Sequence, residues 1–344
     1  MTPLERYRAA LVGRPTDHLP CHPICMIFAA RYSGARFLDY VMDHRVMVNA
    51  QLRLYDELGM DYVATISDPC RETHDLGARC TYFEDEAPAN DARDALLRDK
   101  TKLASLRCPD LLGGGRMHDR IQAVAKLRER LGPHVSVLGW VEGPIALAVD
   151  LRGMEPLMLD TVDDPAFVAD LLEFCVALET EFARLQVAAG ADTVGIGDAA
   201  ASLVSLGTYR REVFPYEQRL VDAIHALGAQ VRLHVCGNTH HLVGDFARLG
   251  CDLVDIDYLC DLAHARAAMP ETAILGNMEP ARWLLRGTPD EVYARLAEHH
   301  AVCGARFVVG AGCEVPPDTP LANFRALVRY AREHTNQEHA AAAG

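Results

Sequence analysis

Short apolar runs alternate with helical patterns along most of the chain, and this alternation restricts the possible fold more than any other feature. A parallel strand needs a long crossover, usually a helix, before the next strand begins, so the alternation predicts a parallel α/β sheet. The number of repeats favours a closed (β/α)₈ TIM barrel, with an open doubly wound sheet as the alternative. Strands are predicted over residues 135–140, 192–197, 231–236, 253–257, 272–276 and 306–310, and helices over 165–187, 209–227, 240–249, 288–300 and 320–333.

The N-terminal part of the chain continues this pattern less regularly. A first strand is predicted near residues 21–28 and another near 62–67, and the polar stretch 85–102 predicts a loop or a short hairpin. The sequence contains no repeat of fixed period and no Ser/Gly linker, so we expect residues 1–339 to form a single domain. The alanine-rich residues 340–344 are expected to form a disordered tail.

Charge and cysteine content narrow the class of protein. The formal net charge of −14 argues against nucleic acids and anionic membranes as partners, because both require a basic surface. We expect no secretory signal and no membrane span, since no uncharged apolar run approaches the length that a bilayer requires. The eleven cysteines are odd in number and scattered through a long chain, which predicts reduced thiols and a cytoplasmic protein.

One strand end carries the strongest chemical signal. His234 and Cys236 are two residues apart in a predicted strand, so their side chains share a face, and Gly237 follows as a turn. By itself this pair is equally consistent with a core histidine beside a buried cysteine. Cys313 comes after another predicted strand, 306–310, and barrel closure would bring the two strand ends to one mouth, where TIM barrels carry their active sites.

These side chains predict a zinc site with a position left for substrate. One imidazole and two thiolates suit zinc and exclude magnesium and calcium as natural occupants. A substrate thiol in the open position would lose its proton and stay nucleophilic at neutral pH. Activation of water for hydrolysis is the weaker alternative, because a thiolate-rich zinc is less electrophilic. Asp255 or Asp257, on the strand between them, would supply a further ligand or orient His234.

The residues around this site resemble a known family. The run HVCGNT at 234–239 and the run GCEVPPDTP at 312–320 are similar to the zinc signature of cobamide-dependent methyltransferases within the uroporphyrinogen decarboxylase family. Similar stretches occur at residues 1–20, 143–148 and 276–280, so the resemblance covers nearly the whole chain.

The resemblance implies a TIM barrel with an N-terminal helical extension. Its implied zinc ligands are His234, Cys236 and Cys313. We further expect Asp68 and Asp257 to act as catalytic residues, and Asn238 and Asn277 to bind the cofactor. Asp257 stands where related thiol methyltransferases have a glutamate ligand, one methylene longer.

The implied reaction is a zinc-dependent transfer of a methyl group between a methylcorrinoid and a thiol. The sequence contains no Asp-x-His-x-x-Gly cobalamin-binding segment, so the corrinoid is expected on a separate protein. The small-molecule partner is then a thiol acceptor or a methyl donor. Demethylation of a small donor onto cob(I)alamin, or transfer to tetrahydrofolate, remain alternatives.

The decarboxylase branch of the same family is another alternative. Asp68 lies in an Ile-Ser-Asp run that resembles true decarboxylases, and it would act with Arg31 without a metal. Ile27 replaces one of the arginines of their substrate-binding motif, and residues 310–312 read Gly-Ala-Gly where a histidine is expected. A substrate with eight carboxylates needs cationic partners, so these departures argue against that activity. A zinc-holding or cobamide-binding barrel without turnover is the non-enzymatic alternative.

Overall fold

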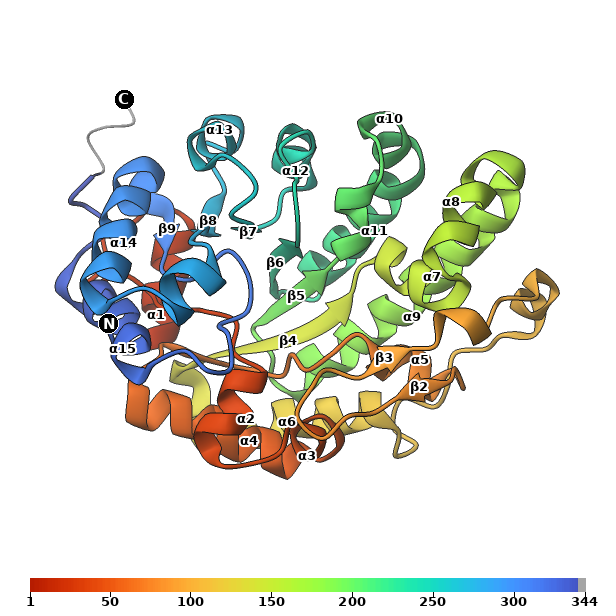
Figure 1. Ribbon diagram of the computed structural model, residues 1–344, viewed down its shortest axis with the longest axis horizontal. Helices are drawn as coiled ribbons and strands as arrows, with labels where there is room; N and C mark the ends of the chain where they lie inside the picture. Colours follow the sequence, from red (N-terminus) through yellow and green to blue (C-terminus); the bar gives the residue numbers. More distant parts are fainter. Residues whose placement is uncertain (340–344) are drawn as a thin grey trace.

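Seven parallel strands form one curled sheet in the computed structural model, which describes residues 1–339 (Figure 1). Their order is β1-β4-β5-β6-β7-β8-β9, and each strand pairs in parallel with the next. Apart from Gln230, every residue in these strands is buried, as expected for a parallel sheet covered on both faces. The strands are β1 (Tyr62–Ala64), β4 (Ser136–Glu142), β5 (Thr193–Gly197), β6 (Gln230–Val235), β7 (Leu253–Ile256), β8 (Ala273–Gly276) and β9 (Phe307–Val308).

The segment 20–22 joins the two edges of this sheet. Val309 donates its backbone N–H to Pro20 at 2.9 Å, His22 donates to Val309 at 2.9 Å, and Asp61 donates to Cys21 at 3.4 Å. The α/β TIM-barrel prediction is therefore confirmed, with this short segment in the place of an eighth strand. The strand predicted over 21–28 is wrong beyond the first residues, because Pro23 has no N–H to donate and the helix α2 begins at Ile27.

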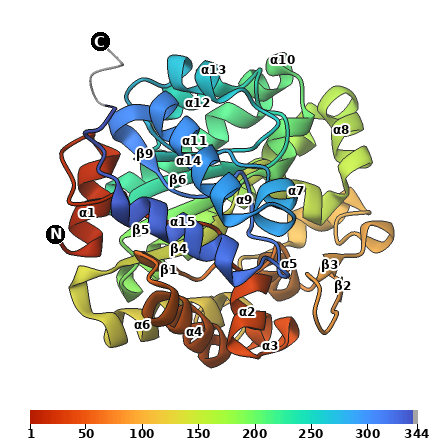
Figure 2. The same ribbon diagram turned by 60° about the vertical axis from the view of Figure 1, so that its left-hand side comes forward.

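Helices cover the outside of the sheet in both ribbon views (Figure 2). Four of them precede β1 and form the expected N-terminal helical extension: α1 (Pro3–Leu11), α2 (Ile27–Ser33), α3 (Phe37–Met42) and α4 (His44–Arg53). The others are α5 (Cys70–Asp75), α6 (Arg116–Leu131), α7 (Pro144–Arg152), α8 (Met154–Asp163), α9 (Pro165–Ala189), α10 (Leu206–Thr208), α11 (Phe214–Ala226), α12 (Val243–Leu249), α13 (Leu262–Ala268), α14 (Pro289–Cys303) and α15 (Leu321–Glu333).

Two local details differ from the sequence prediction. The single helix expected over 209–227 is divided into a π-helical turn over Tyr209–Val213 and the helix α11, because Pro215 cannot continue a helical hydrogen-bond ladder. The polar stretch 85–102, expected to form a loop or a short hairpin, contributes only one strand of a hairpin, β3 (Ala89–Asn90), which pairs with β2 (Cys80–Thr81) before the predicted stretch. The predicted tail at 340–344 lies outside the described residues. None of the described helices combines the length and hydrophobicity needed to cross a membrane.

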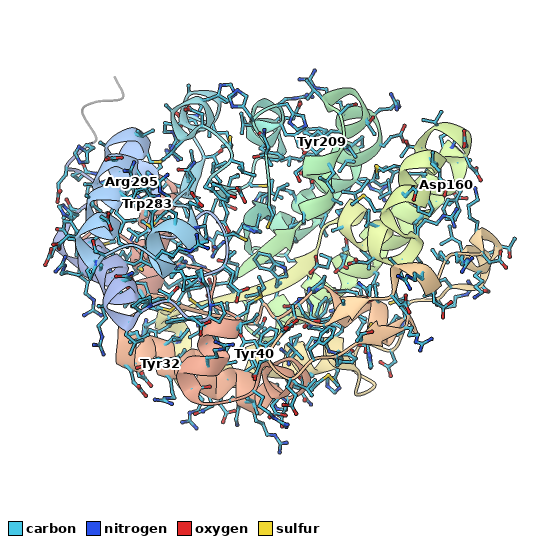
Figure 3. The ribbon with its side chains drawn as sticks, in the orientation of Figure 1. Tyr32, Tyr40, Asp160, Tyr209, Trp283 and Arg295 are labelled. Atoms are coloured by element: carbon cyan, nitrogen blue, oxygen red, sulfur yellow. The ribbon has the colours of Figure 1, made fainter. Side chains whose placement is uncertain are left out.

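Asp198 and Glu217 are two fully buried carboxyls that lie close to each other. Asp198 follows β5, and it accepts the N–H of Ala146 at 2.8 Å. Glu217 on α11 accepts a short hydrogen bond from the hydroxyl of Tyr209, whose position is shown in Figure 3. Burial raises the pKa of Glu217 to about 7, although the hydrogen bond from Tyr209 and the neighbouring Asp198 oppose this rise. Glu217 therefore keeps its proton in the fold at a pH where the unfolded chain has lost it.

We expect the Asp61 carboxylate to be essential for closing the barrel. Asp61 accepts from Arg6 Nη1 at 2.7 Å and from the N–H of Cys21 at 3.0 Å, and all three residues are buried. Asp61→Ala should lower the free energy of unfolding by about 3 kcal/mol, because it leaves a buried guanidinium without this partner. The matched control Asp17→Ala removes the exposed partner of Arg6 and should cost less than about 1 kcal/mol. Urea unfolding measures both, and equal effects would contradict the assignment.

Glu217 should make the protein less stable at alkaline pH. Its pKa is raised in the fold, so its contribution is fully present below the unfolded pKa of about 4.3 and is lost as pH rises through about 7. Glu217→Gln should remove this loss, which is on the order of 2–4 kcal/mol at pH 8. Thermal unfolding at pH 5.5 and pH 8 should therefore show a smaller drop in Tm for the variant than for the wild type. Identical drops would contradict the prediction.

Candidate metal and substrate site

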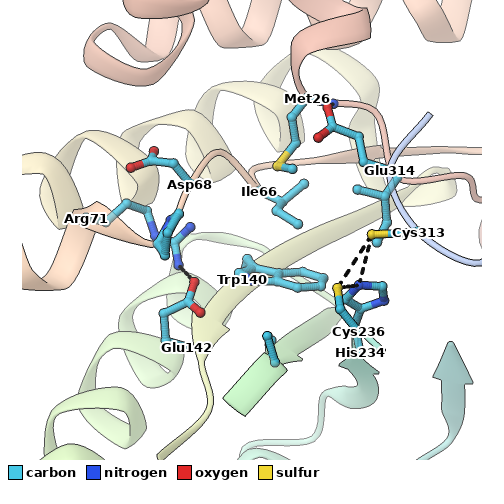
Figure 4. Close-up of a pocket in the computed structure, with 14 residues that line it drawn as sticks. Met26, Ile66, Asp68, Arg71, Trp140, Glu142, His234, Cys236, Cys313 and Glu314 are labelled. Carbon is cyan, nitrogen blue, oxygen red and sulfur yellow. Dashed lines mark hydrogen bonds and ion pairs between the residues drawn. The ribbon is translucent and has the colours of Figure 1, made fainter. Parts of the chain in front are cut away.

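A cavity of about 240 Å³ opens at the carboxyl edge of the sheet. Figure 4 shows His234, Cys236 and Cys313 at one side of it, and Arg71 and Glu142 at the other. Apolar side chains separate the two polar groups. The lining residues are Ile24, Met26, Ile66, Asp68, Pro69, Arg71, Trp140, Glu142, Gly197, Ala199, His234, Cys236, Cys313 and Glu314.

The strand β6 positions two of the three predicted zinc ligands. His234 is paired in register with Gly197 on β5 and with Asp255 on β7, so its imidazole stands among neighbours on both sides. Cys236 follows the last residue of β6, and Gly237 then turns the chain with a φ of 94°. The Nε2 atom of His234 lies 2.9 Å from the Sγ atom of Cys236. The expected common face of these two side chains is therefore present.

Cys313 reaches the same place from the loop after β9. The backbone N–H of Gly312 donates to Met278 at 2.9 Å, which holds this loop against the one that follows β8. The Sγ atom of Cys313 lies 3.5 Å from that of Cys236 and 3.7 Å from Nε2 of His234. The fold thus brings together three donor atoms, although Cys313 is 77 residues from Cys236 and 79 residues from His234 along the chain.

Asp255 contacts the second ring nitrogen of His234, Nδ1. Its carboxylate lies 3.1 Å from Nδ1 of His234, and it accepts from Nε of Arg232 at 2.9 and 3.0 Å. Burial raises the pKa of Asp255, but the Arg232 guanidinium and His234 together outweigh burial and hold that pKa below its ordinary value. An ionised Asp255 favours a proton on Nδ1, and this leaves Nε2 facing the two sulfurs.

The two thiols differ sharply in acidity. The hydrogen bond with Cys236 lowers the pKa of Cys313, and His234 lowers it further against the effect of burial. The same hydrogen bond with Cys313, together with burial, raises the pKa of Cys236. The pair therefore shares a proton, with the negative charge favoured on Cys313. Such a site already stabilises sulfur anions, as a cation-binding thiolate pair must.

The side chains of the other predicted site residues form hydrogen bonds with the backbone of nearby loops. One oxygen of Asp257 accepts the N–H of Gly237 at 3.0 Å, and the other accepts that of Leu259 at 2.9 Å. Asn277 donates to the backbone oxygen of Cys260 at 2.7 Å, and exposed Asn238 accepts the N–H of His240 at 3.1 Å. None of Asp257, Asn238 and Asn277 is among the residues that line the cavity. Asp257 thus shapes the loop that follows Cys236.

Asp68 does line the cavity, but its carboxylate is already paired with the guanidinium of Arg116. Arg116 donates to both oxygens of Asp68, at 2.9 and 2.6 Å. Burial raises the pKa of Asp68, but the ion pair with Arg116, together with Arg71 nearby, more than offsets this effect. The pKa of Asp68 therefore lies below its ordinary value. Arg31 is half-exposed, forms an ion pair with Asp318 and does not line the cavity. The structure therefore does not bring Asp68 and Arg31 together as the metal-free alternative expects.

Sequence reasoning missed the polar group opposite the thiols. Arg71 comes three residues after Asp68, and Glu142 directly precedes the Gly143-Pro144 pair, so both lie beside motifs that were recognised. Arg71 Nη2 donates to Glu142 at 2.8 Å. Burial raises the pKa of Glu142 to about 8 against the opposing effect of Arg71. No local pattern marks these residues, because their partners are 71 positions apart.

Glu314 is a further missed residue, next to Cys313. Its carboxylate accepts the backbone N–H groups of Met26 and Ile27 at 3.1 and 2.7 Å, which ties the start of α2 to the cavity. Burial raises the pKa of Glu314 to about 7, although these two hydrogen bonds oppose it. Its place in the Gly-Cys-Glu run was the available signal, since it follows a predicted ligand.

Relatives with two different activities match this chain over most of their length. A methylcobamide:CoM methyltransferase, MtbA, of Methanosarcina mazei is 27% identical over 97% of this chain and 98% of its own. A uroporphyrinogen decarboxylase of Pelobacter propionicus is 25% identical over 94% of this chain and 97% of its own. The solved structure of a methyltransferase from Methanosarcina mazei superposes with a TM-score of 0.88 at 23% identity, covering 97% of this chain and 99% of that one.

The family is settled by the match to a sequence model rather than by any single relative. The model described as uroporphyrinogen decarboxylase (URO-D) matches residues 2–334, which is nearly all of the chain. The fold agrees with that match, since the curled parallel sheet superposes on a methyltransferase of the same architecture. The chain therefore belongs to the uroporphyrinogen decarboxylase family.

Proposed function

We propose that this protein is a zinc-dependent methyltransferase that moves a methyl group between a methylcorrinoid and a thiol. The observation that carries the proposal is the triangle formed by His234 Nε2, Cys236 Sγ and Cys313 Sγ, with sides of 2.9, 3.5 and 3.7 Å. Relatives named as methylcobamide:CoM methyltransferases, matching 97% of the chain, support the same reaction class. The corrinoid is proposed to be carried by a separate protein.

The donor set fits zinc in kind and, for two of its three separations, in spacing. Zinc–sulfur and zinc–nitrogen bonds of about 2.3 and 2.1 Å in a tetrahedron separate the ligand atoms by about 3.5–3.8 Å, and two of the three sides match this closely. Three protein ligands leave one tetrahedral position for substrate, as catalytic zinc sites do. When bound, zinc would supply the positive charge that keeps a substrate thiol deprotonated at neutral pH.

The surrounding residues prepare this position. Asp255 fixes the imidazole through Nδ1, so that Nε2 is kept for the metal. Trp140 and Ile66 line the cavity beside the thiols and limit the access of water to a bound thiolate. Alignment of the sulfur with the methyl carbon then makes the displacement effectively unimolecular. The methyl group would leave the cobalt as its bond to sulfur forms, and the electron pair would stay on the corrinoid.

The residues of the same site also bear on the alternative reactions. Metal-free decarboxylation would need a cationic surface for carboxylates, and the arginine expected for it, Arg31, lies outside the cavity. Transfer to tetrahydrofolate and demethylation of a small donor would use the same metal. Only thiol methylation predicts that an added thiol consumes methylcobalamin, and neither of these two reactions does.

The function is tested by zinc content and by methylcobalamin consumption. We expect about one zinc per wild-type chain, and loss of methylcobalamin absorbance when a thiol is added. The double variant Cys236→Ser/Cys313→Ser should lose both the metal and at least about 100-fold in rate, because serine hydroxyls are not deprotonated like thiols.

The exposed Cys108 offers a matched control for this experiment, and Cys108→Ser should keep both zinc and rate. A metal-free wild type purified without chelators would contradict the proposal, as would full activity in the double variant. If thiols leave methylcobalamin intact but a methylated donor converts cob(I)alamin to methylcobalamin, the reaction runs in the demethylation direction instead.

Asp255 should strengthen zinc binding without touching the metal. Asp255→Asn keeps the shape of the side chain but removes the charge that supports the imidazole, so zinc affinity should fall about 10–100-fold in a competition with a chromophoric chelator. The neighbouring acid gives the matched variant Asp257→Asn, which should change the affinity less. A larger loss in Asp257→Asn would instead identify Asp257 as a ligand. Thermal unfolding of both variants checks that each is folded.

A further inference from the structure

The end of the cavity away from the thiols contains a guanidinium with an unused donor. Arg71 is only 1% exposed, and its Nη2 donates to Glu72 at 3.0 Å and to Glu142 at 2.8 Å. Its Nη1 is fully buried and has no hydrogen-bond partner among the described residues. A buried charged donor left unpaired is costly. Since Arg71 also lines the cavity, an acceptor on a bound ligand would satisfy it.

Glu142 places an acceptor beside this donor. One of its oxygens takes the Arg71 hydrogen bond, and the other has no partner within the described part of the chain. Glu142 also lines the cavity, where it is 8% exposed. A ligand end that carries both an acceptor and a donor therefore matches this pair of side chains.

The charges of the neighbours decide which kind of group fits. Arg116 donates hydrogen bonds to both oxygens of Asp68, so this ion pair has no net charge with which to bind a ligand. Arg71 lies between two acids, Glu72 and Glu142. A plain anion bound at Arg71 would leave the free oxygen of Glu142 without a donor. A group that also carries a positive charge would supply that donor and favour the ionised form of Glu142.

The strand register gives the separation of the two ends. Glu142 pairs with Gly197, and Gly197 pairs with His234, so the two side chains stand at one level on strands separated only by β5. Neighbouring strands are about 4.8 Å apart, which puts the Cα atoms of Glu142 and His234 about 10 Å apart. The indole of Trp140 packs against Gly197, where an added Cβ would lie 3.0 Å from it, so the floor between the two ends is apolar. A short ligand with an apolar middle therefore suffices to span from the thiols to Glu142.

We propose that the thiol taken by this site is an α-amino-acid thiol, whose carboxylate binds Nη1 of Arg71 and whose ammonium group binds the free oxygen of Glu142. Its sulfur then lies at the His234–Cys236–Cys313 end, with its methylene groups against Trp140 and Ile66. This inference rests on the proposed thiol methyltransferase function and adds the class of its thiol.

Calorimetric binding to the zinc-containing wild type tests the inference with three thiols of matched length. L-Homocysteine carries both charged groups, 4-mercaptobutanoate lacks the ammonium group, and 3-mercaptopropan-1-amine lacks the carboxylate. We expect homocysteine to bind at least tenfold more tightly than either analogue. Equal affinity of 4-mercaptobutanoate would overturn the inference, and so would equal or tighter binding of 2-mercaptoethanesulfonate.

The variant Glu142→Gln assigns this preference to the cavity. It keeps the side-chain shape but removes the charge that would bind the ammonium group, so the preference for homocysteine over 4-mercaptobutanoate should fall below threefold. The control Glu217→Gln neutralises a buried acid that does not line the cavity, and it should keep the wild-type preference. An unchanged preference in a folded Glu142→Gln protein would overturn the assignment to Glu142.

The same preparations separate this inference from the proposed function. If zinc is present and thiols consume methylcobalamin, but homocysteine has no advantage, then the thiol class is wrong and the methyltransferase stands. If homocysteine is preferred by a protein that contains no zinc, then the amino-acid site stands and the zinc mechanism fails.

Discussion

The hydrogen-bonded register of three adjacent parallel strands is the constraint on which the site depends. Gly197, His234 and Asp255 are paired across β5, β6 and β7, so the imidazole has a glycine covered by Trp140 on one side and a carboxylate on the other. A shift of one residue in this register would turn His234 to the other face of the sheet and remove it from the cavity. His234 as a proposed zinc ligand, the acid that orients it and the glycine beneath Trp140 therefore share one structural origin.

Burial gives this arrangement its electrostatic character. Arg232 and Asp255 are nearly inaccessible, and so are Arg71 and Glu72, which means that each charge is balanced by a close partner rather than by water. In such surroundings a hydrogen bond or an ion pair is stronger than at the surface, and an unpaired donor is more costly. Other buried polar atoms near the site, such as those of Arg232 and Glu72, also have no partner among the described residues, but of these residues only Arg71 lines the cavity, and its unpaired Nη1 is informative for this reason.

Membership of the family does not by itself decide the chemistry. Relatives named as methyltransferases and as decarboxylases both match almost the full chain at similar identity. The difference has to lie in the side chains at the mouth of the barrel, as is usual for a fold that hosts several activities. Here those side chains are an imidazole and two thiols at one end of a mostly apolar cavity, and a guanidinium with a carboxyl at the other. This combination fits thiol chemistry better than the binding of many carboxylates.

The sequence alone determined the barrel, because side-chain periodicity and turn residues are local signals. It also predicted His234, Cys236 and Cys313 as one group, since each lies at the end of a recognisable strand. The tertiary structure decided the rest. It showed that Asp255, not Asp257, contacts His234, and that residues 20–22 close the sheet without forming a full strand. It also paired Arg71 with Glu142 at the end of the cavity opposite the thiols (Figure 4). These pairings join residues that are distant along the chain, and they depend on strand register and loop paths that no local pattern encodes.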